Sequence, residues 1–79
     1  IGLEKLITLN IAYNEIQNLL DNTFLDLRSL IRLNLNFNKI SYIQSSSFNG
    51  LLKLENLYLQ YNKLFNIHSV VFENLNNLL

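Results

Sequence analysis

The sequence repeats itself every 24 residues, and this period constrains the fold more than any other feature. Leucine recurs at this interval from Leu6 to Leu78 without an insertion, and seven further positions keep the same spacing over three units. The period divides the chain into a partial unit at 1–5, full units at 6–29, 30–53 and 54–77, and the start of another at 78–79. A unit this small cannot enclose its own core, so it must bury its leucines against its neighbours. We therefore expect a single solenoid segment.

The apolar spacing within one unit indicates a short strand. Leu6, Leu9 and Ile11 are three and then two residues apart, and only the second interval has the period of a strand. We expect strands at about residues 8–12, 32–36 and 56–60, paired side by side as a parallel sheet about 4.8 Å apart. Right-handed crossovers should connect them. The predicted class is α/β, a right-handed solenoid with parallel strands on its concave face and a mostly irregular or 3-10 convex side.

An asparagine follows each expected strand, at Asn14, Asn38 and Asn62. Its amide both donates and accepts, so it can bond exposed backbone groups where the chain turns inward, and it can also bond between neighbouring repeats. Leaving such a buried group unpaired would cost about 1–3 kcal/mol. The column therefore predicts a ladder of structural asparagines whose hydrogen bonds are all satisfied.

A phenylalanine column lies on the far side of each unit, at Phe24, Phe48 and Phe72. Rings stacked at one repeat spacing would form a spine that fills the wider convex side. Asp26, Gly50 and Asn74 follow the three rings, and Gly2 has the same phase. These residue types tolerate positive φ best, so we expect a tight turn at each of these positions.

The segment Leu6-Ile-Thr-Leu-Asn-Ile-Ala-Tyr-Asn14-Glu-Ile16 resembles the leucine-rich-repeat pattern, and the two later units match it as well. The 24-residue length and the phenylalanine column resemble the "typical" class of that family. That class occurs in Toll and Toll-like receptor ectodomains, small proteoglycans and neuronal adhesion proteins. The resemblance implies a horseshoe solenoid, a role in receptor signalling or cell adhesion, and an extracellular or cell-surface location.

The sequence departs from the extracellular members of that family in two ways. The proline that often follows the second leucine is replaced by Leu20, Gln44 and His68, and cysteine-rich capping modules are absent. Solenoids need polar caps. We therefore expect a fragment of a longer array that stacks on further repeats at both ends.

The side chains that alternate with the inward leucines should point to the concave side. They are Thr8, Asn10, Ala12, Arg32, Asn34, Asn36, Asn56, Tyr58 and Gln60. Tyrosine and arginine are enriched in protein-binding sites, so this face is the candidate ligand surface. The alternative is that a solvated face is polar in any case and that these repeats are a structural spacer, with the binding site elsewhere.

A second aromatic column, Tyr13, Phe37 and Tyr61, directly precedes the asparagines. Both neighbours cannot face inward on one strand, so the strand must end between them and leave the rings on its flank. The rings then either pack on one another or contact a ligand. The candidate binding residues are Arg32, Asn34, Asn36, Phe37, Tyr58, Gln60 and Tyr61.

Composition argues against other functions. The six basic and six acidic residues cancel, which leaves no electrostatic footprint for nucleic acid. The chain has no cysteine, His68 is its only histidine, and no nucleophile elbow surrounds Ser45, Ser46 and Ser47. No apolar run exceeds three residues, too short for membrane insertion. We expect a partner that is a protein, and no enzyme activity, cofactor or metal.

Overall fold

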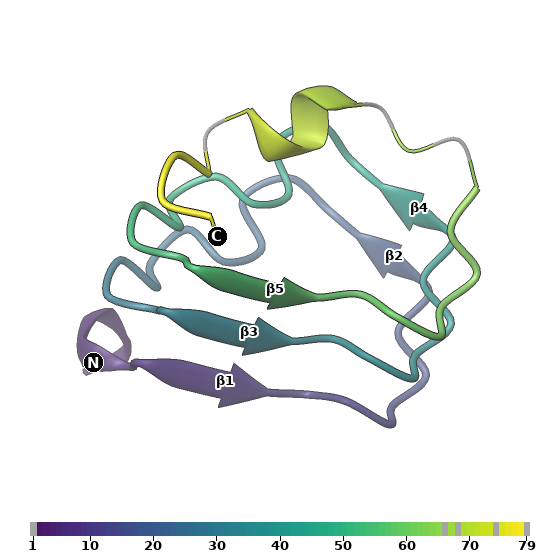
Figure 1. The fold of residues 1–79 in the computed structure, drawn as a ribbon, viewed down its shortest axis with the longest axis horizontal. Coiled ribbons are helices and arrows are strands. Elements are labelled where there is room, and N and C mark those ends of the chain that lie inside the picture. The colour runs from purple at the N-terminus through teal and green to yellow at the C-terminus, as the bar shows by residue number, and fades with distance from the viewer. Residues whose placement is uncertain (1, 66, 68, 74, 79) are drawn as a thin grey trace.

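The computed structural model describes residues 2–65, 67, 69–73 and 75–78, and its main feature is a parallel three-stranded sheet. Strands β1 (Thr8–Asn10), β3 (Arg32–Asn34) and β5 (Asn56–Tyr58) lie side by side in that order (Figure 1). Thr8 pairs with Arg32, and Arg32 pairs with Asn56. Partners are therefore one 24-residue period apart, which confirms the predicted sheet and its register.

Hydrogen bonds between repeats continue beyond the assigned strands. The Tyr13 N donates to Asn36 O (3.1 Å) and the Phe37 N donates to Gln60 O (3.0 Å). Each strand is shorter than the five residues expected. The backbone hydrogen bonds between repeats nevertheless continue as far as Tyr13 and Phe37, where the sequence predicts that the strands end.

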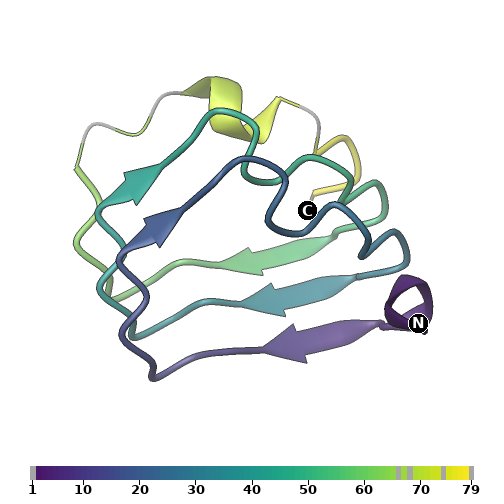
Figure 2. The same ribbon diagram turned by 180° about the vertical axis from the view of Figure 1, so that it is seen from behind.

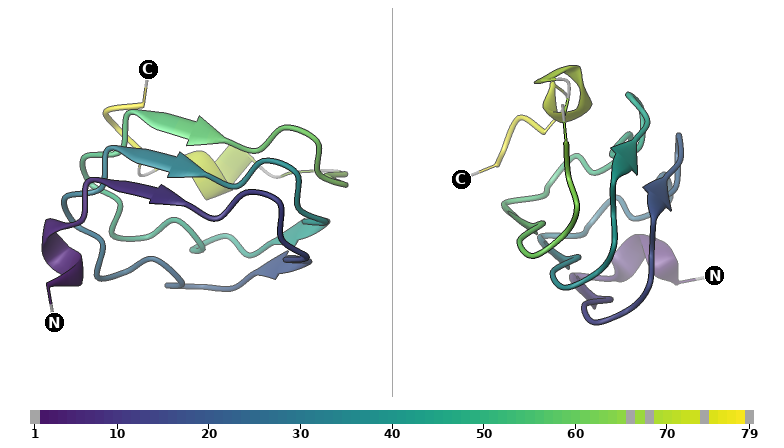
Figure 3. Two further views of the ribbon diagram at one scale, coloured as in Figure 1. Left: turned by 90° about the horizontal axis from the view of Figure 1, so that it is seen from below. Right: turned by 90° about the vertical axis from the view of Figure 1, so that its right-hand side faces the viewer.

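The chain between the end of one strand of the sheet and the start of the next, here named the return path, is more regular than expected. Strands β2 (Asn18–Leu19) and β4 (Tyr42–Ile43) form a second parallel pair. Figures 2 and 3 show this pair in a separate layer from the three-stranded sheet. The described residues also form two 3-10 helices, η1 (Leu3–Lys5) and η2 (Ser69–Phe72). The predicted solenoid class is confirmed, with a second small sheet on the side that the sequence predicts to be mostly irregular or 3-10.

The core runs between the two layers and is tightest in the middle repeat. Leu30, Leu33, Leu35 and Ile40 of this repeat are fully buried, as is Leu54, which begins the next repeat and packs on it. The other equivalent side chains of the outer repeats are only partly buried and pack against this cluster. The middle repeat has a neighbour on each side, whereas an outer repeat has one, and nearest-neighbour burial in a solenoid produces this gradient.

The phenylalanine rings of the three repeats stack on one another. Phe24 and Phe48 stack with ring centroids 6.1 Å apart, and Phe48 and Phe72 with centroids 6.0 Å apart. Phe24 and Phe48 are buried. The spine therefore joins all three repeats on the side opposite the strands.

The turn after the spine requires glycine in the middle repeat. Gly50 has φ +93, and a Cβ built there would lie 2.5 Å from Leu25 O. Gly2 also has positive φ, whereas Asp26 does not, so the expectation was wrong there. The left-handed residue near the phenylalanine of that repeat is Asn22 (φ 61), two positions before Phe24. Asn74 lies outside the described residues.

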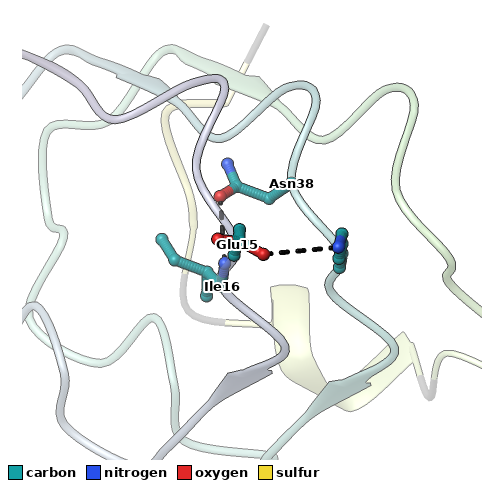
Figure 4. Close-up of polar contacts among 4 residues, drawn as sticks. Glu15, Ile16 and Asn38 are labelled. Atoms are coloured by element: carbon teal, nitrogen blue, oxygen red, sulfur yellow. Dashed lines mark hydrogen bonds and ion pairs between the residues drawn. The ribbon is translucent and has the colours of Figure 1, made fainter.

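The asparagine ladder joins neighbouring repeats through the backbone. Asn38 Nδ2 donates to Leu35 O in its own repeat (3.0 Å) and to Ile11 O in the preceding one (3.1 Å). Its Oδ1 accepts from the Ile16 N (3.2 Å), as Figure 4 shows. Asn62 repeats this pattern, with its Oδ1 accepting from the Ile40 N (3.0 Å).

Asn14, at the first step of the ladder, is the exposed member. Its Nδ2 donates to Ile11 O (2.9 Å) and Ala12 O (3.1 Å) within its own repeat. No repeat precedes it among the described residues. The bonds within repeats are therefore present at all three positions, and those between repeats at Asn38 and Asn62.

Candidate functional site

The outward side chains of the three strands and of the two residues after each form one surface, here named the strand face. It comprises Thr8, Asn10, Ala12, Arg32, Asn34, Asn36, Asn56, Tyr58 and Gln60. The register places Asn34 between Asn10 and Tyr58 in one row across the sheet. The 24-residue period predicts this arrangement of neighbours, because strands one period apart pair residue by residue.

Asparagines on the strand face hold the backbone as well as facing solvent. Asn10 Oδ1 accepts from the Ala12 N (3.0 Å), and Asn34 Oδ1 accepts from the Asn36 N (3.0 Å). This bond to the residue two positions ahead is an Asx-type turn, which satisfies an amide just past each strand. Asn34 is therefore not a free polar side chain, which its position in the sequence did not reveal.

Tyr58 occupies the position of Asn10 and Asn34 in the third repeat, but its ring cannot accept from the backbone in the same way. The Gln60 N, which corresponds to the Ala12 N and the Asn36 N, instead donates to Asn36 Oδ1 (2.7 Å). A side chain of the middle repeat thus replaces the missing acceptor. Tyr58 remains 38% exposed on the strand face.

The aromatic flank, which consists of Tyr13, Phe37 and Tyr61, lies beside the strand face. The rings stack in parallel with centroids 4.5 Å apart at both steps. All three residues have positive φ, between 58 and 60. This conformation is unfavourable for bulky residues, and here it separates each ring from the inward asparagine that follows. The strand break inferred from the sequence is located at this left-handed residue.

The flank rings pack on one another, which was one of the two alternatives, yet they stay accessible. Tyr13 is 76% exposed, Tyr61 is 72% exposed, and Phe37 between them is 38% exposed. Stacking covers both faces of the central ring, whereas the edges and the tyrosine hydroxyls are left for solvent. Stacking and ligand contact are therefore compatible at this column.

Charge on the strand face is sparse. Arg32 is its one ionised side chain, and it is exposed. Glu55, which directly precedes the Asn56 position of the face, is half-buried. The ion pair between Lys39 and Glu15 (3.4 Å) lies beyond the aromatic flank, and both side chains are largely exposed. Salt should therefore screen it strongly.

Among the serine and histidine residues considered for catalysis, the described ones make hydrogen bonds that support the fold. Ser47 is fully buried, and its Oγ donates to Leu19 O (2.8 Å), so it ties two return paths together. The Ser46 N donates to Asp21 Oδ1 (2.9 Å). His68 lies outside the described residues. Within the described ranges, no group of three or more histidine, cysteine, aspartate or glutamate residues is placed to hold a metal ion.

No helix among the described residues is long and apolar enough to cross a membrane.

Comparisons with known proteins agree with this architecture. A family profile described as "Leucine rich repeat" matches residues 28–79. No curated protein matches the chain. A solved structure described as "Crystal structure of TLR13-ssRNA13 complex" superimposes with a TM-score of 0.90 and 36% sequence identity, over 92% of this chain and 10% of the matched chain. This chain therefore spans about a tenth of the length of that relative. Since the profile covers more than half of the sequence and the repeats have the expected fold, this chain belongs to the leucine-rich-repeat family.

Proposed function

We propose that this segment recognises a protein partner through the strand face and the aromatic flank. The supporting observation is Tyr58, an exposed ring at a position where the other two repeats use asparagine to hold the backbone. Tyrosine gives a large contact area and loses little rotamer entropy on binding. Arg32 and Asn34 lie in the neighbouring strand, paired with Asn56 and Tyr58.

The candidate binding residues are those of two adjacent repeats. They are Arg32, Asn34, Asn36, Phe37, Tyr58, Gln60 and Tyr61. Asn34 and Asn36 contribute mainly through their Nδ2 groups, because their Oδ1 atoms accept from the backbone. The segment acts by binding, without catalysis, as part of an extracellular or cell-surface ectodomain that serves in signalling or adhesion.

Further repeats stack on both ends of this segment in the proposed arrangement. At the N-terminal end of the solenoid, a hollow of about 300 Å³ is lined by the apolar side chains of Leu3, Leu6 and Leu9, among others. At the other end, Leu57, Leu59 and Leu64 are only partly buried. Leucine side chains left half-covered at a solenoid end are the surface that a neighbouring repeat buries.

The alternative function is a structural spacer that holds a binding site located elsewhere. Photo-crosslinking separates the two. A photo-reactive residue in place of Gln60 should capture the partner on cells, whereas the same residue in place of Asn18, on β2 of the return path, should not. Equal capture, or capture at neither position, would favour the spacer.

The affinity of the captured partner for alanine variants then tests which residues of the strand face contribute to binding. Tyr58→Ala should weaken binding by roughly 2 kcal/mol or more, as expected at a hot spot. Arg32→Ala should weaken it through an acidic partner group, with an effect that fades as salt is added. A thermal melt of each variant controls for folding. If both variants fold and bind like the parent, the spacer function replaces the recognition function.

The matched relative was solved in complex with ssRNA. For this chain, the zero net charge and the single arginine on the strand face favour a protein partner, because RNA binding draws most of its affinity from contacts between basic residues and phosphates.

A further inference from the structure

The hydrogen bonds of the strand face fix which way its asparagine amides point. A backbone N–H needs an oxygen acceptor, so Asn10, Asn34 and Asn36 must each turn Oδ1 toward the amide that they bond. The orientation follows from this chemistry: a flipped amide would bring two donors together. Each Nδ2 group is therefore directed away from its backbone partner.

These Nδ2 groups are free to bind a ligand. None of the three Nδ2 atoms donates a hydrogen bond to another described residue. Every buried side-chain nitrogen or oxygen of the described residues does have a hydrogen-bond partner, so an Nδ2 atom without one is not buried. The unbonded Nδ2 atoms of the half-buried Asn34 and Asn36 must therefore reach solvent. Asn10 is itself exposed. Three amide donors with fixed orientation thus lie on one surface.

The remaining polar groups do not reverse this bias. Arg32, which is exposed beside Asn34, carries only donors. The side chains of Thr8, Asn56, Tyr58 and Gln60 can each donate as well as accept, so they favour neither kind of ligand. No carboxylate lies on the strand face, and Glu55 at its border is half-buried. The face as a whole offers more donors than acceptors.

We propose that the strand face is a donor surface that selects an acidic peptide segment. Carboxylates of that segment bind Arg32 and the Asn34 amide, and its main-chain carbonyls bind the Asn10 and Asn36 amides. A single cation surrounded by neutral amides suits carboxylates and carbonyls better than a run of phosphates. This inference rests on the proposed protein-binding function and adds the chemistry of the partner.

Aspartate substitutions test the donors without removing the acceptors. Asn34→Asp and Asn36→Asp keep the oxygen that the backbone needs, and each replaces an outward donor by an acceptor. Asn18→Asp, on β2 of the return path, makes the same charge change away from the strand face. Thermal melts of all three variants should stay close to that of the parent.

Binding is measured by fluorescence anisotropy with labelled hexaglutamate, hexalysine and hexauridylate. The parent should bind hexaglutamate in preference to the other two probes. Asn34→Asp and Asn36→Asp should each weaken hexaglutamate binding at least about tenfold, because each replaces a hydrogen-bond donor by a negative charge that repels the probe. Asn18→Asp should change it less than about twofold, because solvent screens a distant surface charge.

Three outcomes would overturn the inference. They are no preference of the parent for hexaglutamate, equal weakening by the Asn18 variant, and preferential binding of hexauridylate, which would identify an RNA backbone as the ligand. Binding of the captured protein partner to the variants distinguishes the donor surface from the more general recognition function. If Tyr58→Ala weakens its binding but Asn34→Asp does not, the donor surface fails while the recognition function stands. If neither does, both fail.

Discussion

Asn38 is the position where the ladder can be tested most directly. Its side chain is buried and makes four hydrogen bonds, with Nδ2 donating to Ile11 O, Leu35 O and Asn36 O, and Oδ1 accepting from the Ile16 N. Asn38→Ala removes all four at once. Counted at about 1 kcal/mol each, they would give about 4 kcal/mol as an upper limit.

The structure lowers this limit, because the three carbonyl oxygens each keep a second donor after the substitution. These donors are Asn14 Nδ2, Asn62 Nδ2 and the Tyr13 N. Only the Ile16 N–H then lacks an acceptor, and an unsatisfied donor costs about 1–3 kcal/mol. With the weakened carbonyl bonds added, we expect Asn38→Ala to lower the free energy of unfolding by about 2–3 kcal/mol.

Urea denaturation of this 79-residue chain would measure this loss. Asn14→Ala is the matched control: Asn14 is exposed and only donates, so its loss should cost about 0.5–1 kcal/mol. Lys39→Ala and Glu73→Ala should be nearly silent, because both residues are exposed. An Asn38→Ala variant within about 0.5 kcal/mol of the parent, or an equal loss in Asn14→Ala, would refute the ladder argument.

Two further predictions compare matched positions. Leu33→Ala should cost ~2–5 kcal/mol as a buried truncation, and the partly buried Leu57 should cost less unless another repeat covers it; equal losses in this chain, measured by denaturation, would contradict the burial gradient. Gly50→Ala should lower the melting temperature more than Gly2→Ala, because both glycines have positive φ but only the new Cβ at Gly50 would meet backbone, 2.5 Å from Leu25 O. Similar melting temperatures for the two variants would argue against this close approach.

The sheet was predictable because the repeat supplies its register directly. Once Leu9 and Leu33 are recognised as equivalent, parallel pairing one period apart follows, and the pairs Thr8–Arg32 and Asn34–Tyr58 need no further information. The ladder was predictable for a related reason. An inward asparagine amide at a turn has backbone groups to bond, and stacked repeats bring the same groups to Asn38 and Asn62.

The second sheet was not predictable from the pattern. Strands of two residues, such as Asn18–Leu19 and Tyr42–Ile43, are too short to show a period of two. Their pairing follows from the stacking of whole repeats, which holds the return paths at strand spacing. Local sequence therefore gave no signal, and only the three-dimensional arrangement creates the bonds.

Left-handed backbone at the aromatic flank also overrides residue preference. Tyr13 and Phe37 are poor candidates for positive φ by residue type, whereas Asp26 was a better one and does not adopt it. The flank residues gain ring stacking at 4.5 Å, and their N–H groups donate to the next repeat. Such contacts between repeats can offset a local cost of about 1–3 kcal/mol.

The candidate site shows why outward position alone does not identify a binding residue. Asn34 and Tyr58 occupy equivalent positions, but Asn34 holds the backbone and Tyr58 does not, because Asn36 supplies the acceptor for the Gln60 N.

A thermodynamic cycle tests this compensation. Asn36→Ala should cost about 0.5–1.5 kcal/mol in the parent. In a Tyr58→Asn background it should cost almost nothing, because the new amide can accept from the Gln60 N as Asn34 does from its own partner. Additive losses within about 0.3 kcal/mol would show that the two positions are independent. Coupling would show that the tyrosine is tolerated on the strand face only because the neighbouring repeat has taken over its backbone bond.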